Sequence, residues 1–178
     1  MKEEDKPLSD KIEGAPHPSR TKKIFGQETA SKEFLDLFTA SRLHHAWLLN
    51  GPRGIGKATL AWQLTKFLLA TPDLNLGSDS IKSKFEVPTT LEISPDHPIS
   101  QRIAVGSEPG VFVLRRAYDE KRKRFKQVIT VDEVRKLKTF FGLKSADAGR
   151  RIIIVDCADD MNANAANALL KILEEPPK

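Results

Sequence analysis

A glycine-rich loop between an apolar run and an amphipathic segment constrains the fold of this 178-residue chain more than any other feature. The apolar run His45 to Asn50 comes first and is expected to be a strand, and the loop itself reads Gly51-Pro52-Arg53-Gly54-Ile55-Gly56-Lys57. Glycines let backbone amides turn toward anionic oxygens, a following helix adds its positive N-terminal end, and a lysine reaches the outer phosphates. The order of strand, glycine turn and helix therefore predicts a phosphate-binding loop.

The residue after the lysine departs from the pattern of such loops. A Ser or Thr hydroxyl there would ligate the magnesium ion of a nucleotide, but this chain has Ala58. Thr59 lies about 100° further round a helix and is a poor substitute. We expect nucleotide binding to be weak, with no cofactor required. The nucleotide-binding candidates, as a vestigial site, are Gly51, Pro52, Arg53, Gly54, Ile55, Gly56, Lys57, Ala58 and Thr59.

A second apolar run ends on an acidic residue. Ile152 to Val155 are consecutive β-branched residues, which predicts a parallel strand buried on both faces, and Asp156 closes it. A metal-orienting carboxylate belongs at Asp156, but the thiol of Cys157 cannot polarise an attacking water as a further carboxylate would. Because Ala58 and Cys157 remove different catalytic parts, we expect no ATP hydrolysis by the chain itself. An active ATPase that uses Thr59 and Asp156 is the alternative.

The rest of the chain alternates between helical and strand patterns, which predicts an α/β fold with a parallel sheet and flanking helices. Residues 1–23 are expected to be a flexible lead, with order beginning near Ile24, and residues 71–110 an irregular insertion with one short helix. A strand is predicted at Val111 to Leu114. The stripe Phe34, Leu37 and Phe38 predicts a helix before the loop.

Three further helices have predicted faces or caps. The helix after the loop should bury one face and leave Gln63 and Lys66 in water; the buried set is Leu60, Ala61, Leu64, Phe67 and Leu68. Thr130 and Glu133 form a capping box for a helix that ends at Gly142 and turns Val134, Leu137 and Phe141 inward. Asn162 is expected to cap a last helix with the buried stripe Ala166, Leu169, Leu170 and Leu173.

Composition excludes several classes of protein. One cysteine and four scattered histidines predict no disulfide and no metal site, zinc included. No apolar run approaches the ~20 residues that span a bilayer, so a cytoplasmic location is expected. The net charge is +5, with seven basic residues close together: Arg115, Arg116, Lys121, Arg122, Lys123, Arg124 and Lys126. This run predicts contact with DNA phosphates or an acidic partner, and a solvated hairpin or loop is the alternative.

Four stretches of the chain resemble the AAA+ clamp-loader family, and most closely its delta-prime subunits of bacterial DNA polymerase III. They are Ile24-Phe25-Gly26-Gln27, His44 to Leu49 running into the loop, Thr130 to Arg135, and Ile154 through Asn164-Ala165-Ala166-Asn167-Ala168-Leu169-Leu170-Lys171 to Pro177. The resemblance implies a P-loop NTPase fold. It also implies a DNA-replication role as a non-catalytic subunit of a nucleotidyltransferase complex, which helps load the sliding clamp onto primed DNA beside gamma/tau and delta subunits. An active gamma/tau-like subunit, or a DNA-binding scaffold, is the alternative.

The resemblance covers only the first part of such a domain. Residues 24–178 correspond to its N-terminal portion, apparently truncated after the acidic-motif strand and helix, and the arginine-finger segment, lid and collar are absent. In this family a further strand lies between Ala46 to Asn50 and Ile152 to Asp156. We therefore expect either a longer polypeptide or a gap closed by direct strand pairing or by a neighbour's strand.

Overall fold

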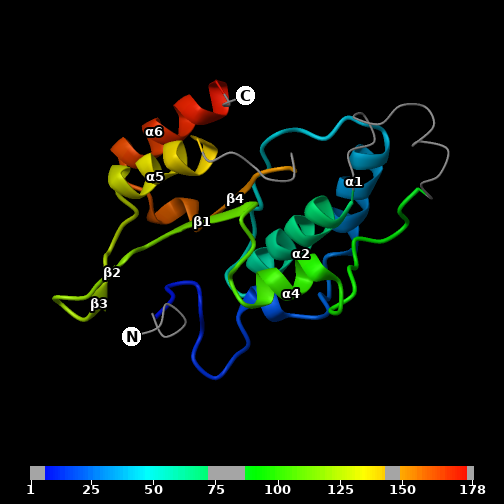
Figure 1. Ribbon diagram of the computed structural model, residues 1–178, viewed down its shortest axis with the longest axis horizontal. Coiled ribbons are helices and arrows are strands. Elements are labelled where there is room, and N and C mark those ends of the chain that lie inside the picture. The colour runs from blue at the N-terminus through cyan, green and yellow to red at the C-terminus, as the bar shows by residue number, and fades with distance from the viewer. Residues whose placement is uncertain (1–6, 72–86, 143–148, 176–178) are drawn as a thin grey trace. The chain divides into compact units, whose positions relative to one another are not determined.

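The computed structural model describes residues 7–71, 87–142 and 149–175. The chain divides into two compact units, residues 19–108 and residues 1–18 together with 109–178, and each unit is described by itself. Figure 1 labels the helices and strands of both.

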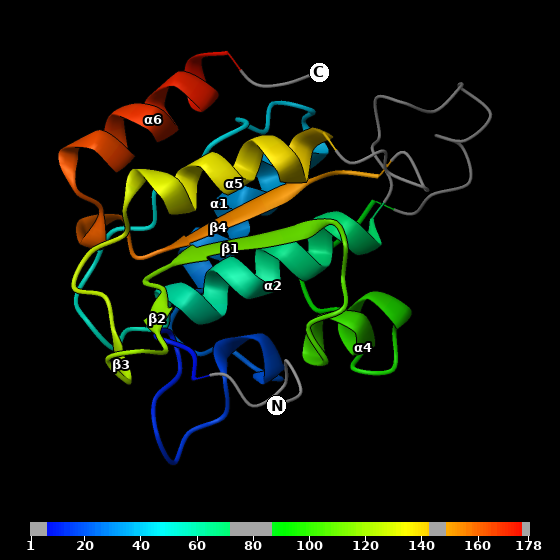
Figure 2. The ribbon, with the colours of Figure 1, turned by 60° about the vertical axis from the view of Figure 1, so that its left-hand side comes forward.

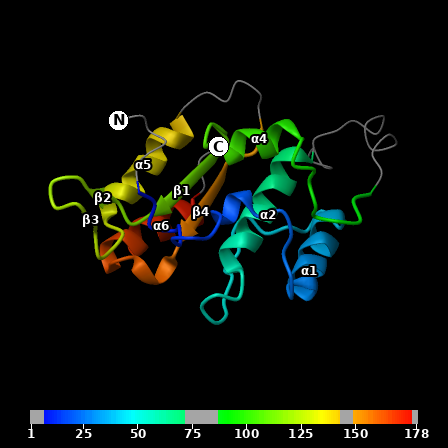
Figure 3. The same ribbon diagram turned by 90° about the horizontal axis from the view of Figure 1, so that it is seen from below.

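Helices dominate the unit of residues 19–108. It contains α1 (Glu28–Thr39), α2 (Lys57–Ala70) and the short α4 (Pro98–Ala104), which begins with Pro98 after the cap His97. Figure 3 shows α1 and α4 beside α2. The core is built from six residues: Phe34, Phe38, Leu60, Leu64, Phe67 and Leu91. The helix at residues 28–39 and the short helix within the insertion are thus confirmed, whereas residues 72–86 of the insertion lie outside the described residues.

The strand predicted at His45 to Asn50 is wrong. Within the described residues this segment pairs with no strand, and Leu48 is 82% exposed. Trp47 instead packs its ring on Phe34, with 5.1 Å between centroids, and donates a hydrogen bond from Nε1 to the His44 carbonyl at 3.1 Å. An apolar run indicates burial, but a strand also needs a neighbour to take its backbone hydrogen bonds.

The second unit has a parallel pair of strands at its centre. Strands β1 (Val111–Arg115) and β4 (Ile152–Asp156) pair in register, from Val111 beside Ile152 to Arg115 beside Asp156. Figure 2 shows the two strands side by side with α5 and α6. The predicted α/β class and parallel pairing are confirmed for these strands. The prediction that β4 is buried on both faces is wrong, since only Ile154 is buried. Both strands of a pair are edge strands, and α5 and α6 cover one face of this pair.

Helices α5 (Val131–Gly142) and α6 (Ala163–Glu174) pack on that face of the strands. Val134 and Leu137 of α5 are buried as predicted, and Phe141 packs beside them. The cap of α6 is also confirmed, because Asn162 Oδ1 accepts a hydrogen bond from the Ala165 amide at 2.9 Å. At the start of α5 only half of the capping box forms: Glu133 accepts the Thr130 amide at 2.9 Å, but the Thr130 hydroxyl bonds the same carboxylate instead of the Glu133 amide.

The buried stripe of α6 is rotated from its prediction. Ala165 is fully buried, and Ala168, Leu169 and Ile172 pack beside it. Leu170, expected inside, is 51% exposed. Several adjacent apolar residues made more than one helical face possible, so the pattern did not determine which face packs.

A short antiparallel hairpin follows β1. It consists of β2 (Tyr118–Asp119) and β3 (Arg124–Phe125), with Tyr118 opposite Phe125. The short 3-10 helices η2 (Pro18–Arg20) and η3 (Ala158–Asp160) complete the described elements. The basic run thus forms a hairpin whose turn lies at residues 120–123.

Candidate functional site

The glycine loop has backbone conformations that favour glycine. Gly54 and Gly56 have φ of +86° and +98°, a region that favours glycine, and α2 begins at Lys57 directly after them. The loop amides and the helix N-terminus together form a cradle for anionic oxygens. Gln27 supports the loop from outside by donating a hydrogen bond from Nε2 to the Ile55 carbonyl at 2.9 Å. Gln27 belongs to a stretch that carried the family resemblance, but it was not predicted as a site residue.

Backbone carbonyls of the loop hold the Lys57 side chain. Its Nζ donates hydrogen bonds to the carbonyls of Gly51 at 2.8 Å and Pro52 at 2.9 Å. The ammonium group is therefore positioned over the loop, where the oxygens of a phosphate could replace the carbonyls as acceptors.

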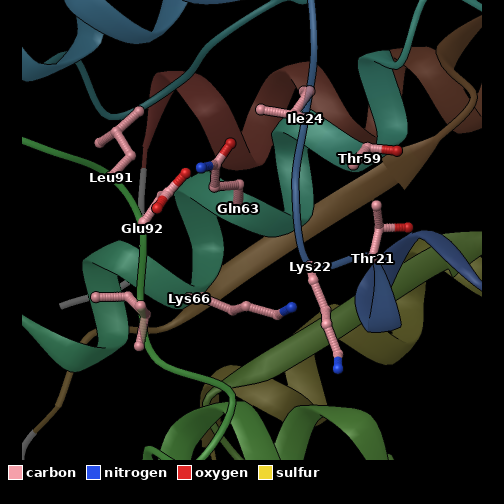
Figure 4. Close-up of a pocket in the computed structure, with 9 residues that line it drawn as sticks. Thr21, Lys22, Ile24, Thr59, Gln63, Lys66, Leu91 and Glu92 are labelled. Atoms are coloured by element: carbon pink, nitrogen blue, oxygen red, sulfur yellow. The ribbon is translucent and has the colours of Figure 1, made fainter.

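The cation part of a nucleotide site is not matched by the residues after Lys57. Ala58 has no ligand atom. Thr59 lines a small cavity of about 20 Å³, together with Gln63 and Lys66 at helical spacing along α2. Figure 4 shows these three side chains, with Leu91 and Glu92 from a neighbouring segment. The Thr59 side chain belongs to this cavity rather than to the position of Ala58.

This cavity corrects the expected water-facing side of α2. Lys66 is half-buried, and burial lowers the pKa of its ammonium group. The Gln63 Oε1 atom is buried with no hydrogen-bond partner among the described residues. Trp62 and Thr65 are buried too, so α2 packs on most of its circumference and not on one stripe. A cavity of this volume holds about one water molecule, which is too small for a nucleotide.

Asp156 lies in an ionic cluster that the sequence did not indicate. Arg115, its partner in register, donates two hydrogen bonds of 2.8 Å from Nη1 to the Asp10 carboxylate, and His17 Nε2 lies 3.1 Å from the same carboxylate. The Asp10 side chain is only 1% exposed. Residues 7–20, expected within a flexible lead, thus make buried ionic contacts that a search for apolar periodicity does not detect.

The two carboxylates of this cluster have opposite pKa shifts. Burial raises the pKa of Asp156, and the neighbouring Asp10 raises it further. Burial alone would also raise the pKa of Asp10, but its bonds to His17 and Arg115 outweigh burial and lower it. Asp10 thus holds Arg115 and His17, and burial disfavours the ionised form of Asp156.

Cys157 is exposed, and its surroundings favour the protonated thiol over the thiolate. Partial burial and the nearby Asp160 raise the pKa of the thiol. A neutral thiol is neither a carboxylate substitute nor an activated nucleophile. Asp160 is itself paired, 2.9 Å from Arg116.

Comparisons with known proteins place the chain in a family. Residues 26–178 match the family model described as "DNA polymerase III, delta subunit". The chain belongs to this family. The predicted relationship to the delta-prime subunits of the clamp loader is thereby confirmed.

Relatives of this DNA polymerase III family member include two kinds of subunit. The chain is 36% identical to DNA polymerase III subunit delta' of Pseudomonas aeruginosa over 74% of its own length and 34% of that protein. It is 28% identical to subunit delta' of Bacillus subtilis over 77% of its length and 34% of the relative. It is also 28% identical to subunit gamma of Buchnera aphidicola subsp. Schizaphis graminum over 90% of its length and 38% of the relative. The chain thus spans little more than a third of each of these relatives.

Two general properties of this family member concern membranes and metals. Among the described residues, no helix has the length and apolar character to cross a bilayer. In the same residues, no three His, Cys, Asp or Glu side chains gather as ligands for a metal ion. Three separate features are candidates for function, each within one unit: the glycine loop, the cluster around Asp156 and the basic hairpin.

Proposed function

We propose that the chain is part of a non-catalytic, delta-prime-like subunit of the DNA polymerase III clamp loader, which acts in DNA replication. Its partners in this role are gamma/tau and delta subunits, and through them the sliding clamp and primed DNA. A cytoplasmic location, the absence of zinc and weak ATP or ADP binding belong to the same proposal. Membership of the DNA polymerase III delta family supports it.

The observation that carries the non-catalytic part is Ala58 beside a well-formed loop. Positive-φ glycines, and a lysine bonded to the loop carbonyls of Gly51 and Pro52, support anion binding at this loop. Ala58 offers no oxygen to magnesium, and the Thr59 side chain lines the cavity with Gln63 and Lys66. Phosphoryl transfer from ATP requires a metal ion bridging the phosphate oxygens, so this loop supports binding better than hydrolysis.

The surroundings of Asp156 support the same conclusion. Asp156 lies beside Asp10, which binds Arg115 and His17, and burial disfavours its ionised form. The next residue, Cys157, provides no carboxylate to position water.

A working gamma-like ATPase is the second candidate. It is favoured by the similarity to a subunit gamma over 90% of the chain. This candidate requires magnesium to be held by Thr59 and Asp156 despite the contacts just described.

Phosphate release from ATP with magnesium distinguishes the two candidates. We expect no turnover above background by the purified protein, and none after Lys57→Ala. The double variant Ala58→Thr with Cys157→Glu restores the missing groups and is the variant in which turnover could appear. Turnover by the unchanged protein that Lys57→Ala abolishes would refute the non-catalytic proposal and support the ATPase.

A further inference from the structure

The seven basic residues of the run at 115–126 separate into two sets. Three of them have carboxylate partners inside the same unit: Arg115 binds Asp10, Arg116 lies 2.9 Å from Asp160, and Lys126 lies 2.8 Å from Glu133. Their charges are used within the fold. The remaining four are all exposed at the hairpin turn and its second strand: Lys121, Arg122, Lys123 and Arg124.

These four side chains lack close internal partners. The nearest carboxylate to Arg122 is Asp119, at 3.9 Å, which is at the limit of an ion pair. Among the described residues, no carboxylate lies within ion-pair distance of Lys121, Lys123 or Arg124. We call residues Lys121–Arg124 the basic turn.

Hydrogen bonds from backbone amides hold the basic turn in shape. Asp119 Oδ1 accepts hydrogen bonds from the amides of Lys121 at 3.0 Å and Arg122 at 3.1 Å. The Lys126 amide donates to the Ala117 carbonyl at 2.8 Å below the turn. Since the turn is already ordered, less conformational entropy is lost when a ligand binds it.

A hollow of about 500 Å³ lies beside the basic turn. Its lining offers cationic, amide and hydroxyl groups together with two apolar side chains and one carboxylate: Arg122, Arg124, Lys126, Gln127, Thr130, Phe125, Val128 and Asp119. Arginine, lysine, glutamine and threonine are the side chains that contact phosphate and sugar in protein complexes with DNA. The hollow therefore offers donors for a sugar-phosphate chain.

The aromatic residues of the hairpin are occupied with each other. The rings of Tyr118 and Phe125 pack edge to face with 5.3 Å between centroids. They are therefore not free to stack on bases, nor to serve as the buried aromatic anchors on which protein interfaces depend. This favours a ligand held by charge along a backbone over an acidic protein segment.

We propose that the basic turn and its hollow are a docking surface for the phosphodiester backbone of DNA, without sequence preference. Lys121, Arg122, Lys123 and Arg124 contact phosphates, and the hollow receives the adjoining sugar-phosphate unit. The proposal is independent of whether the glycine loop supports hydrolysis. It also assigns Arg115 and Arg116 to folding and not to DNA, whereas Lys126 lines the hollow and is paired with Glu133.

Salt-dependent binding of a short mixed-sequence DNA duplex to the full chain tests this surface. Arg122→Glu with Arg124→Glu should weaken binding and reduce the slope of log K against log salt by about two units, one for each lost phosphate contact. Lys136→Glu with Lys138→Glu, on exposed positions of α5, makes the same change in net charge and should leave the slope unchanged. Arg122→Gln with Arg124→Gln reports on the contacts without charge reversal.

Each remaining outcome decides against the surface. Equal losses in the hairpin and α5 variants would show that net charge alone matters. Unchanged binding by both hairpin variants would leave the turn a solvated hairpin. Polyglutamate that displaces the duplex from the unchanged protein at equal charge concentration would assign the surface to an acidic protein. A duplex of different sequence should bind with the same affinity, and a strong preference would overturn the backbone mode.

Discussion

The glycine loop and the end of β4 differ in which features of a nucleotide site they contain. The loop keeps the glycine φ values and the lysine contacts of a phosphate site, and it lacks only the hydroxyl after the lysine. At the end of β4 the acidic residue is present, but it lies beside Asp10 in an ionic cluster that holds residues 7–20 in place. A residue type found at catalytic sites can thus occupy its expected position while burial and a neighbouring carboxylate disfavour its charged form.

The largest effect should come from Asp10, which organises the cluster at β4. Asp10→Ala removes a buried carboxylate and leaves the partly buried Arg115 without its partner, and breaking a buried pair costs about 3 kcal/mol. Asp36→Ala is the matched control, because Asp36 pairs with Lys32 on the surface and its loss should cost about 0.5 kcal/mol or less. Urea unfolding measures both. Equal, small losses would contradict a structural role for the Asp156 region.

The next effect concerns the loop, where a bound ligand should raise stability. If the loop binds ADP, a concentration 100 times the Kd stabilises the fold by about 2.7 kcal/mol. Lys57→Ala should abolish the ADP-induced rise in melting temperature, whereas Lys32→Ala, on the surface of the same unit, should retain it. A rise that survives Lys57→Ala would place the ligand elsewhere.

The smallest effect should be the pH dependence of Asp156, which has the opposite sign from that of Asp10. The pKa of Asp156 is higher in the folded state than in the unfolded state. The ionised carboxylate therefore lowers the stability of the fold at pH values above the folded pKa, and it has no such effect below the unfolded pKa. Asp156→Asn should therefore raise stability at neutral pH, with the gain disappearing in acid. The folded pKa of Asp10 is lowered, so its contribution is present above the unfolded value and is lost as pH falls through the folded pKa.

Unfolding measured from neutral to acidic pH compares the two residues directly. Loss of stability on Asp156→Asn at neutral pH would mean that the carboxylate is needed in its charged form. That result would favour a metal-orienting role over the structural one.

Local patterns predicted the elements that depend on nearby residues. The loop glycines, the cap at Asn162, the end of α5 and the pairing class of β4 all follow from spacing within a few residues. The family resemblance also rests on short, continuous stretches, so it can be recognised from the sequence without a structure.

The failures concern features that depend on distant partners. Residues 45–50 have a strand composition but no neighbouring strand to pair with, and α6 has apolar residues on more than one side. The partner of Arg115 is Asp10, 105 positions away, and no local pattern indicates that this arginine is used internally. The sequence alone does not separate the basic turn from the other basic residues of the run. The difference is the carboxylate partners of Arg115, Arg116 and Lys126.

We propose that the loop binds phosphates without a magnesium ligand at Ala58. Calorimetric titration of the protein with ADP, in magnesium and then in chelator, measures this binding. We expect the same affinity in both conditions, lost in Lys57→Ala, and a magnesium-dependent gain only after Ala58→Thr. Tighter binding by the unchanged protein in magnesium would contradict it, and so would no binding of ADP in either condition.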